Sequence, residues 1–350
     1  MPTGTYERYG LTGNPFRDLA SESLDNVAIF HVNQEVDDSL RTIRDEVLDR
    51  ENRAVVAVIG DLGAGKTERL LVTLAEARDR KAFCVYFDVT TRTPWVLRGL
   101  ATEFQKAATR AKLAKLFGSP PWLRPLTALA KSKDEKYDAK ATGRVLAAAL
   151  NGTTPSFLLL NDLHNLVETK EIDAFSRVLQ EVTDAIKPGV LVMFTCYASY
   201  LAWLNVNHPA LASRINRTFL LKSLADDEAG LVLAKKLLVK RLVEDLDPIY
   251  PFDRDAVHAM NVAAHGNPRR LLEIADLAVE YGVSHRSYRV DTDVVQAVLS
   301  QRQATDVAAD ILRREDPPPP PVRAPASSAP DPKRVGPSPP TKPAVWAESK

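Results

Sequence analysis

One stretch of the sequence has the glycine, lysine and hydroxyl spacing of a phosphate-binding loop: Gly60-Asp61-Leu62-Gly63-Ala64-Gly65-Lys66-Thr67. Its glycines permit backbone angles that turn successive N–H groups toward a phosphate. The ammonium group of Lys66 would reach the β- and γ-phosphates, and the hydroxyl of Thr67 would bind Mg²⁺. A helix that begins near Lys66 would add the positive end of its dipole, and we include Glu68 among the cofactor-lining residues. The stretch predicts a site for ATP and Mg²⁺.

A second chemical element is expected at the end of another strand. P-loop ATPases use a carboxylate there to hold the water shell of Mg²⁺, and usually a neighbouring Glu to polarise the attacking water. The candidate is the apolar run Phe157–Leu160, which is followed by Asn161 and Asp162. If Asn161 takes the metal-side place, a neutral amide replaces the carboxylate, and Asp162 is a base one methylene shorter than Glu. If Asp162 takes that place, Leu163 leaves no base. Both alignments predict slow ATP hydrolysis.

The elements that must position these residues alternate between apolar strands and helices. We expect strands over residues 54–59, 82–89, 157–160, 190–195 and 219–221, and helices over residues 35–48 and 68–80. Short apolar strands separated by helices indicate a parallel sheet covered on both faces. After about Ser223 the strands stop, and helices are expected over residues 226–246, 254–264, 269–281 and 292–312. The predicted fold class is α/β, a P-loop three-layer αβα parallel sheet followed by a small helical lid domain and a disordered tail.

The same patterns divide the chain into four parts. We assign residues 1–50 to a lead-in and a helix, 51–222 to the nucleotide-binding domain, 223–315 to the helical lid and 316–350 to the tail. The tail carries 12 of the 24 prolines, including the run Pro317–Pro321. Such a segment cannot bury enough apolar surface to offset its ordering entropy. It is either a plain tether or a docking peptide for a protein that reads proline-rich segments.

Composition and charge limit the kinds of partner and compartment that we expect for this protein. The 46 Lys and Arg residues nearly balance the 45 Asp and Glu residues, so a net charge of +1 shows no global attraction to nucleic acid. Cys84 and Cys196 lie in apolar runs and are expected to be small core residues. The start of the chain has no secretory pattern, and no apolar run reaches bilayer-spanning length. We therefore expect a cytoplasmic protein with no membrane partner.

Residues 103–144 form a basic insertion between the second and third strands. They contain ten basic residues against four acidic ones, a local charge of +6, together with Phe117 and Trp122. A positive stripe with aromatic residues could bind a phosphate backbone and stack on bases of DNA. The alternative is a solvated helical insertion in which Trp122 is packed. No convincing helix-turn-helix accompanies it.

The order of these elements resembles that of AAA+ ATPases, specifically the branch of origin-recognition initiators and of bacterial helper ATPases of secretion and transposition. The resemblance spans about Tyr9 to Leu312. The segment Tyr9–Phe16 is similar to the "GL-x-x-x-PF" lead-in of the helpers, and Leu158–Leu166 is similar to their "LLIDEAHNL". Asn161 and Asp162 stand where that family has Asp and Glu, a departure that predicts weak hydrolysis and leaves the predicted fold unchanged.

The resemblance implies three further roles. Thr195 would be sensor 1, which detects the γ-phosphate, and Arg269, in Gly266-Asn-Pro-Arg269, would be sensor 2 on the lid. Arg214 or Arg217 would be an arginine finger that reaches the ATP of a neighbouring subunit. The protein would then assemble with copies of itself through the ATP site. Two hypotheses follow: a DNA-associated helper ATPase, or an ATP-binding regulator that hydrolyses poorly and recruits a protein partner without nucleic acid.

Overall fold

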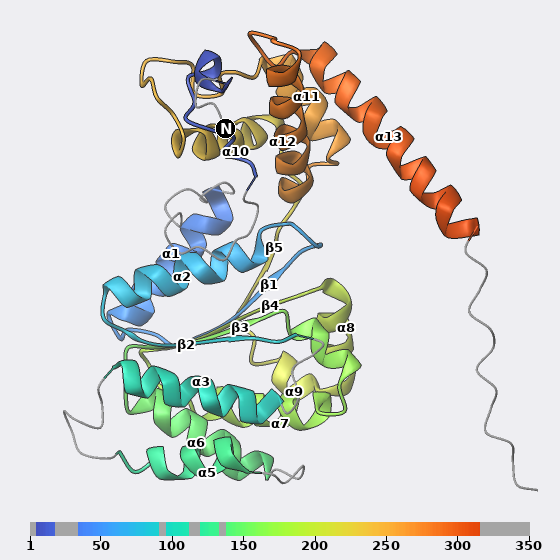
Figure 1. Ribbon diagram of the computed structural model, residues 1–350. Coiled ribbons are helices and arrows are strands. Elements are labelled where there is room, and N and C mark those ends of the chain that lie inside the picture. The colour runs from blue at the N-terminus through green and yellow to red at the C-terminus, as the bar shows by residue number, and fades with distance from the viewer. Residues whose placement is uncertain (1–4, 18–33, 91–95, 112–119, 133–137, 316–350) are drawn as a thin grey trace, which may run out of the picture. The chain divides into compact units, whose positions relative to one another are not determined.

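The computed structural model describes residues 5–17, 34–90, 96–111, 120–132 and 138–315 (Figure 1). The chain divides into two compact units, Met1–Arg302 and Gln303–Lys350. The first unit holds the sheet, the phosphate loop and most of the described helices. The predicted tail, 316–350, lies outside the described residues.

Among the described residues, five parallel strands form one sheet in the order β2-β3-β4-β1-β5. Their bounds are β1 (Ala54–Ile59), β2 (Phe83–Asp88), β3 (Ser156–Asn161), β4 (Val190–Cys196) and β5 (Arg217–Leu220). Every residue of β1, β3 and β4 is buried. Parallel strands buried on both faces read as continuous apolar runs, which is the pattern that predicted them.

Helices cover both faces of the sheet (Figure 1). One face carries α1 (Gln34–Leu48) and α2 (Lys66–Asp79). The other face carries α3 (Val96–Arg110), α6 (Ala139–Asn151) and α7 (Ile172–Ala185), with α5 (Leu123–Lys131), α8 (Ala198–Asn207) and α9 (Pro209–Ala212) on the same side. Alternate residues of β1 enter two different cores, since Val56 and Val58 pack on the first face and Val55 and Ala57 on the second. This three-layer α/β arrangement is the predicted one.

The helical part follows β5 and has its own apolar core. Its helices are α10 (Asp226–Leu238), α11 (Arg254–Ala263), α12 (Pro268–Ser284) and α13 (Thr292–Glu315). Tyr9, Leu11 and Phe16 of the lead-in are fully buried in this core, next to the short turn η2 (Glu7–Tyr9). The lead-in therefore packs with the last helices, although the two lie at opposite ends of the folded sequence.

The first of these helices is shorter than predicted. We expected helix over residues 226–246, but α10 ends at Leu238. The following residues pair with the lead-in instead: Leu11 forms an antiparallel bridge with Arg241, and the N–H of Thr12 donates to the carbonyl of Lys240 at 2.8 Å. This tertiary pairing overrides local helix propensity, so the last part of the helix prediction was wrong.

Two other expectations concern the cysteines and the membrane. Cys84 and Cys196 are buried and unpaired in separate strands. Their placement confirms that they are core residues, and burial raises the pKa of each thiol to about 12. Within the described ranges, no helix combines the length and apolar character needed to cross a membrane.

Candidate nucleotide-binding site

The phosphate loop connects β1 to α2 and has the backbone shape that its glycines allow. Gly63 and Gly65 have φ angles of 81° and 87°, in the left-handed region that favours glycine. The Nζ of Lys66 donates to the carbonyl oxygens of Gly60 and Asp61, both at 2.8 Å. Lys66 is 6% exposed, and burial lowers the pKa of its ammonium group. The ammonium therefore lies inside the loop, where phosphate oxygens would exchange with these carbonyls.

The hydroxyl of Thr67 lies beside the end of β3. Thr67 Oγ1 donates to Oδ1 of Asn161 at 3.2 Å, and Thr195 Oγ1 donates to the same oxygen at 2.8 Å. Asn161 is 3% exposed, and Thr195 is fully buried. Three predicted site residues from α2, β3 and β4 are thus brought together, and Asn161 lies next to the expected metal ligand. This placement corresponds to the first of the two alignments considered above.

The other side of the Asn161 amide faces two carboxylates. Its Nδ2 donates to Oδ1 of Asp88 at 3.0 Å and to Oδ2 of Asp162 at 3.3 Å. Carboxylate oxygens accept but do not donate, so the two aspartates fix the amide with its nitrogen toward them and its oxygen toward the hydroxyls. We call Thr67, Asp88, Asn161, Asp162 and Thr195 the strand-end network. Asp88 is the last residue of β2 and was not among the predicted site residues, although it lies in the strand predicted over residues 82–89.

Asp162 has an unusual backbone. Its φ and ψ of 54° and 47° are left-handed, which is uncommon for a residue other than glycine. Its N–H donates to Thr195 Oγ1 at 2.7 Å, a contact that helps to hold this conformation. Such conformations cost roughly 1–3 kcal/mol and cluster at functional sites. The negative charge of Asp162 acts on Lys66, whose pKa it raises against the larger lowering by burial.

Two further aromatic side chains near Lys66 were not predicted from the sequence. The ring of Tyr197, directly after β4, lies 4.7 Å from Lys66 Nζ in a cation–π contact. The ring of His164 lies against that of Tyr197 in a tilted arrangement, with centroids 3.7 Å apart. Burial lowers the pKa of His164, which favours a neutral imidazole. Both residues follow strand ends, but nothing in their types or spacing distinguishes them from core aromatics.

The helical part contacts the outer side of the phosphate loop. Asn267 caps α12, and its Nδ2 donates to the carbonyl of Leu62 at 2.7 Å. A Cβ placed on Gly63 would lie 2.7 Å from both Asn267 Oδ1 and Arg269 Cβ. Arg269, the expected sensor 2, thus lies in the first turn of the helix that faces the loop, and its exposed guanidinium lies 3.7 Å from Glu273.

A cavity of about 1050 Å³ lies between the loop and α12. Its lining includes Asp61, Leu62 and Ala64 of the loop and Arg269 and Arg270 of the helix. Known ligand pockets have volumes of roughly 300–1,000 Å³, so the space is adequate for a nucleotide. Its lining also includes Lys222 and Glu273, so three basic side chains face two carboxylates, those of Asp61 and Glu273.

The two candidate finger arginines lie away from this site. Arg217 begins β5 and is opposite Val56 in β1, whereas the loop follows Ile59 at the other end of that strand. Arg214 is half-exposed and forms an ion pair with Asp184 of α7. In the described part of the chain, neither side chain forms a hydrogen bond or ion pair with the phosphate loop of the same subunit.

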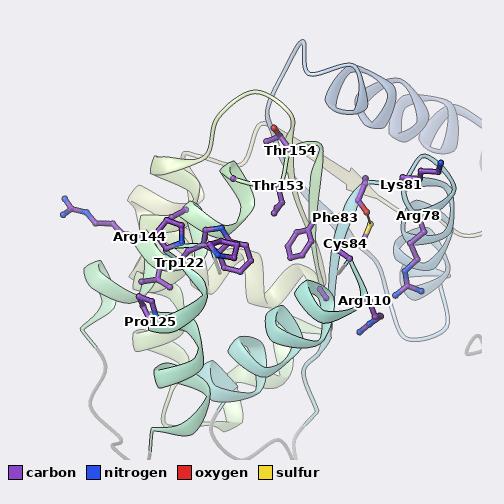
Figure 2. Close-up of a pocket in the computed structure, with 18 residues that line it drawn as sticks. Arg78, Lys81, Phe83, Cys84, Arg110, Trp122, Pro125, Arg144, Thr153 and Thr154 are labelled. Atoms are coloured by element: carbon purple, nitrogen blue, oxygen red, sulfur yellow. Dashed lines mark hydrogen bonds between the residues drawn. The ribbon is translucent and has the colours of Figure 1, made fainter. Parts of the chain in front are cut away.

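A larger cavity of about 1450 Å³ lies beside the start of β2 (Figure 2). The phosphate loop instead follows the carboxyl end of a strand, where β1 ends at Ile59. The described lining of this cavity includes four basic residues and no carboxylate: Arg78, Lys81, Arg110 and Arg144. Trp122 lines the cavity and lies against Phe83, with ring centroids 6.5 Å apart, and it is only 7% exposed. It is therefore packed, as in the second interpretation of the basic insertion, and cannot stack on bases. Phe117, Lys112 and Lys115 lie outside the described residues.

The donors around Thr67 fit Mg²⁺. They are a hydroxyl, an amide carbonyl and carboxylates, all oxygen ligands of the kind that Mg²⁺ prefers. Within the described ranges, no three His, Cys, Asp or Glu side chains gather closely enough to hold a metal by themselves. A metal here would thus depend on phosphate oxygens and water for its other ligands, as Mg²⁺ with ATP does.

No protein-family model matches the sequence, and no curated protein matches it. Solved structures match its fold. The Aeropyrum pernix ORC2 protein (ADPNP–ADP complexes) has a TM-score of 0.53 and 14% identity over 79% of this chain and 68% of that chain. Cdc6p from Pyrobaculum aerophilum has a TM-score of 0.52 and 14% identity, over 79% and 67%. The Aeropyrum pernix ORC1 protein in complex with DNA has a TM-score of 0.52 and 14% identity, over 84% and 72%.

These matches define the class of fold. The chain has an AAA+ P-loop fold of the kind seen in ORC and Cdc6 proteins. At 14% identity the likeness extends to the fold alone. The resemblance to helper ATPases of secretion and transposition stays a prediction.

Proposed function

We propose that the protein binds ATP with Mg²⁺ between the phosphate loop and α12, and that it acts as a nucleotide-dependent oligomeric switch. The observation that carries this proposal is the junction of Thr67, Asn161 and Thr195 directly beside the buried Lys66. Lys66 would bind the phosphates, Thr67 would bind the metal and Thr195 would detect the γ-phosphate. Mg²⁺ would supply positive charge to the phosphate oxygens.

We infer slow hydrolysis from the same network. Asn161 contributes no charge at the place nearest Thr67, and Asp162 is held by a hydrogen bond to the Asn161 amide. Asp162 would still accept a proton from an attacking water, but its shorter side chain is tied to the neighbouring residue. Both features should lower the rate of ATP hydrolysis more than the affinity for ATP, because phosphoryl transfer depends on metal charge and on a well-placed base.

Oligomerisation is part of the proposal because neither candidate finger arginine contacts the phosphate loop of its own chain in the described residues. The exposed Arg214 and Arg217 lie away from the loop of their own subunit, so either would act on the ATP of a neighbour. Arg269 would couple the same ATP to the helical part of its own chain. The predicted divisions, 51–222 for the nucleotide-binding domain and 223–315 for the lid, belong to this proposal.

The test is ATP binding and hydrolysis by the full chain. Lys66→Ala should abolish detectable ATP binding, whereas Lys187→Ala, an exposed lysine distant from the loop, should leave it unchanged. Wild-type turnover should be slow, and Arg214→Ala or Arg217→Ala should lower turnover without lowering ATP affinity. Retention of ATP binding in Lys66→Ala would rule out the proposed site.

A second candidate function is DNA association at the cavity of Figure 2. Four cations without a carboxylate in its described lining suit a phosphate backbone. The joint charge reversal Lys81→Glu and Arg144→Glu should then weaken DNA binding at low salt, while ATP binding persists. Absence of any salt-dependent DNA affinity would favour the regulator that recruits a protein partner, for which the tail 316–350 is the proposed docking segment.

A further inference from the structure

The last residue of β2 places a carboxylate next to the metal-side position. Asp88 is the register partner of Asn161 in the adjacent strand β3. Its Oδ1 accepts a 3.0 Å hydrogen bond from Asn161 Nδ2, and its side chain is exposed at the carboxyl edge of the sheet. Ligands of open α/β sheets bind outside the carboxyl ends of the strands, so Asp88 lies at the edge where a nucleotide and its metal would bind.

The negative charge at this edge of the sheet lies on β2, one strand away from the residue of β3 that contacts Thr67. Asn161, which contacts Thr67, is neutral, and the carboxylate is on the far side of its amide. The amide also bonds to Asp162, so its two protons hold two carboxylates at once. An aspartate at position 161 would face both of them without a donor, and like charges this close repel strongly in a partly buried site. The amide at position 161 and the carboxylate at position 88 are therefore complementary, since the first donates the hydrogen bond that the second accepts.

We propose that Asp88 supplies the metal-side carboxylate that Asn161 lacks, and that Asn161 holds Asp88 in place for this role. The inference rests on the proposed binding of ATP with Mg²⁺. It makes Asp88 a residue that binds the metal or its water shell, and Asn161 a positioning residue. Mg²⁺ in nucleotide sites keeps several waters and needs only one or two carboxylates, so charge delivered through water is sufficient.

A simpler role for Asp88 would be to orient the Asn161 amide. The two roles differ in what they require of residue 88. Orientation requires a hydrogen-bond acceptor, which the amide oxygen in Asp88→Asn still provides. Metal binding requires the negative charge, which Asp88→Asn removes. The substitution keeps the size of an exposed side chain, so it should leave folding intact.

The experiment measures ATP affinity of the full chain with Mg²⁺ and with EDTA, for wild type, Asp88→Asn and the charge swap Asp88→Asn with Asn161→Asp. The swap returns the carboxylate to β3 and keeps an amide donor between the two positions. Asp88→Asn should reduce the Mg²⁺-dependent gain in affinity roughly tenfold to a hundredfold, with little change in EDTA. The swap should recover most of that gain. Asp49→Asn, at an exposed surface ion pair, is the matched control and should behave as wild type.

Two results would overturn the inference. One is a Mg²⁺-dependent gain in Asp88→Asn equal to that of wild type. The other is a swap variant no better than Asp88→Asn although thermal unfolding shows both to be folded. Neither result bears on ATP binding itself, which Lys66→Ala tests in EDTA as well as in Mg²⁺. Loss of binding in Lys66→Ala together with an unchanged Asp88→Asn would leave the proposed function standing and remove only the role of Asp88.

Discussion

The side-chain amide of Asn267 donates a 2.7 Å hydrogen bond to the backbone carbonyl of Leu62, and so joins the cap of α12 to the phosphate loop. The same side chain accepts from the N–H groups of Arg269 and Arg270 through Oδ1. One residue therefore satisfies the start of the helix and touches the loop that would hold ATP. A change in loop shape on nucleotide binding would be felt directly at α12.

Asn267→Ala should lower the free energy of unfolding by about 1 kcal/mol, because an N-cap is lost. It should also weaken ATP binding, because α12 is no longer joined to Leu62. Asn267→Asp separates the two effects: it keeps the cap oxygen and loses the donor to Leu62. Calorimetric unfolding and an ATP titration of both variants provide the measurement. Equal stability of Asn267→Ala and wild type would contradict the capping role.

Gly63→Ala tests the close approach of loop and helix. A Cβ at Gly63 would lie 2.7 Å from Arg269 Cβ and from Asn267 Oδ1, and the φ of 81° disfavours any side chain there. We expect destabilisation of about 1–3 kcal/mol and weaker ATP binding. Gly13→Ala is the matched control, since a Cβ there meets nothing within 4 Å. Similar melting temperatures for the two variants would show that the loop and helix are not in contact.

Asn161→Asp should make the stability of the protein depend on Mg²⁺. Without metal, the new carboxylate faces Asp88 and Asp162 and replaces the donor to both, so unfolding should become easier by roughly 1–3 kcal/mol. Mg²⁺ binds the folded site and should restore stability by mass action, more than it does in wild type. Thermal unfolding with Mg²⁺ and with EDTA measures the effect. An equal response of wild type and variant to Mg²⁺ would argue against a cation site beside Thr67.

Acid should destabilise the fold through His164. Burial lowers the pKa of His164 from its ordinary value of 6.5, so below pH 6.5 the unfolded chain takes up a proton that the folded protein does not. This contribution to stability is present above pH 6.5 and falls until the pH reaches the folded pKa. His164→Gln should therefore flatten the stability profile between pH 7.5 and about 5 in denaturant titrations. An unchanged stability profile in His164→Gln would contradict this role of His164.

Tyr197→Leu should loosen Lys66. The tyrosine ring lies 4.7 Å from the ammonium, and such contacts contribute about 0.5–2 kcal/mol. Tyr197→Phe keeps the ring and should bind ATP as wild type does, whereas Tyr197→Leu should bind several-fold more weakly. Titration with ATP at fixed Mg²⁺ distinguishes them. Equal affinity in all three proteins would mean that the ring does not hold Lys66.

Local patterns predicted much of the fold. The bounds of β1 agree with the apolar run at residues 54–59, and those of β4 differ by one residue from the prediction. The order of the strands was not predicted, because it depends on long-range pairing that no short window contains. The limit of helix α10 was missed for the same reason, since Leu11 pairs with Arg241 across more than two hundred residues.

The residues of the candidate site likewise fall into those that local sequence patterns predicted and those that depend on the fold. The loop from Gly60 to Thr67 and the pair Asn161 and Asp162 have residue types and spacing that indicate their chemistry. Asp88 has only its position at a strand end, and its meaning depends on which strand lies beside β3. Sheet order and register, not sequence distance, bring Asp88 to Asn161. The carboxyl ends of neighbouring parallel strands meet at one side of a sheet, where ligands bind. This general rule is the signal that could have pointed to Asp88.

The burial of the lead-in has a practical consequence for dissecting the molecule. Tyr9, Leu11 and Phe16 are fully buried among helices that begin two hundred residues later, and Phe16 meets Phe252 edge to face at 5.8 Å. The helical core is thus discontinuous in sequence and assembled from both ends of the folded region. A fragment cut at residue 223 would lack three large apolar side chains and expose the surface that they cover. Only a fragment that retains residues 5–17 could form this core as it stands.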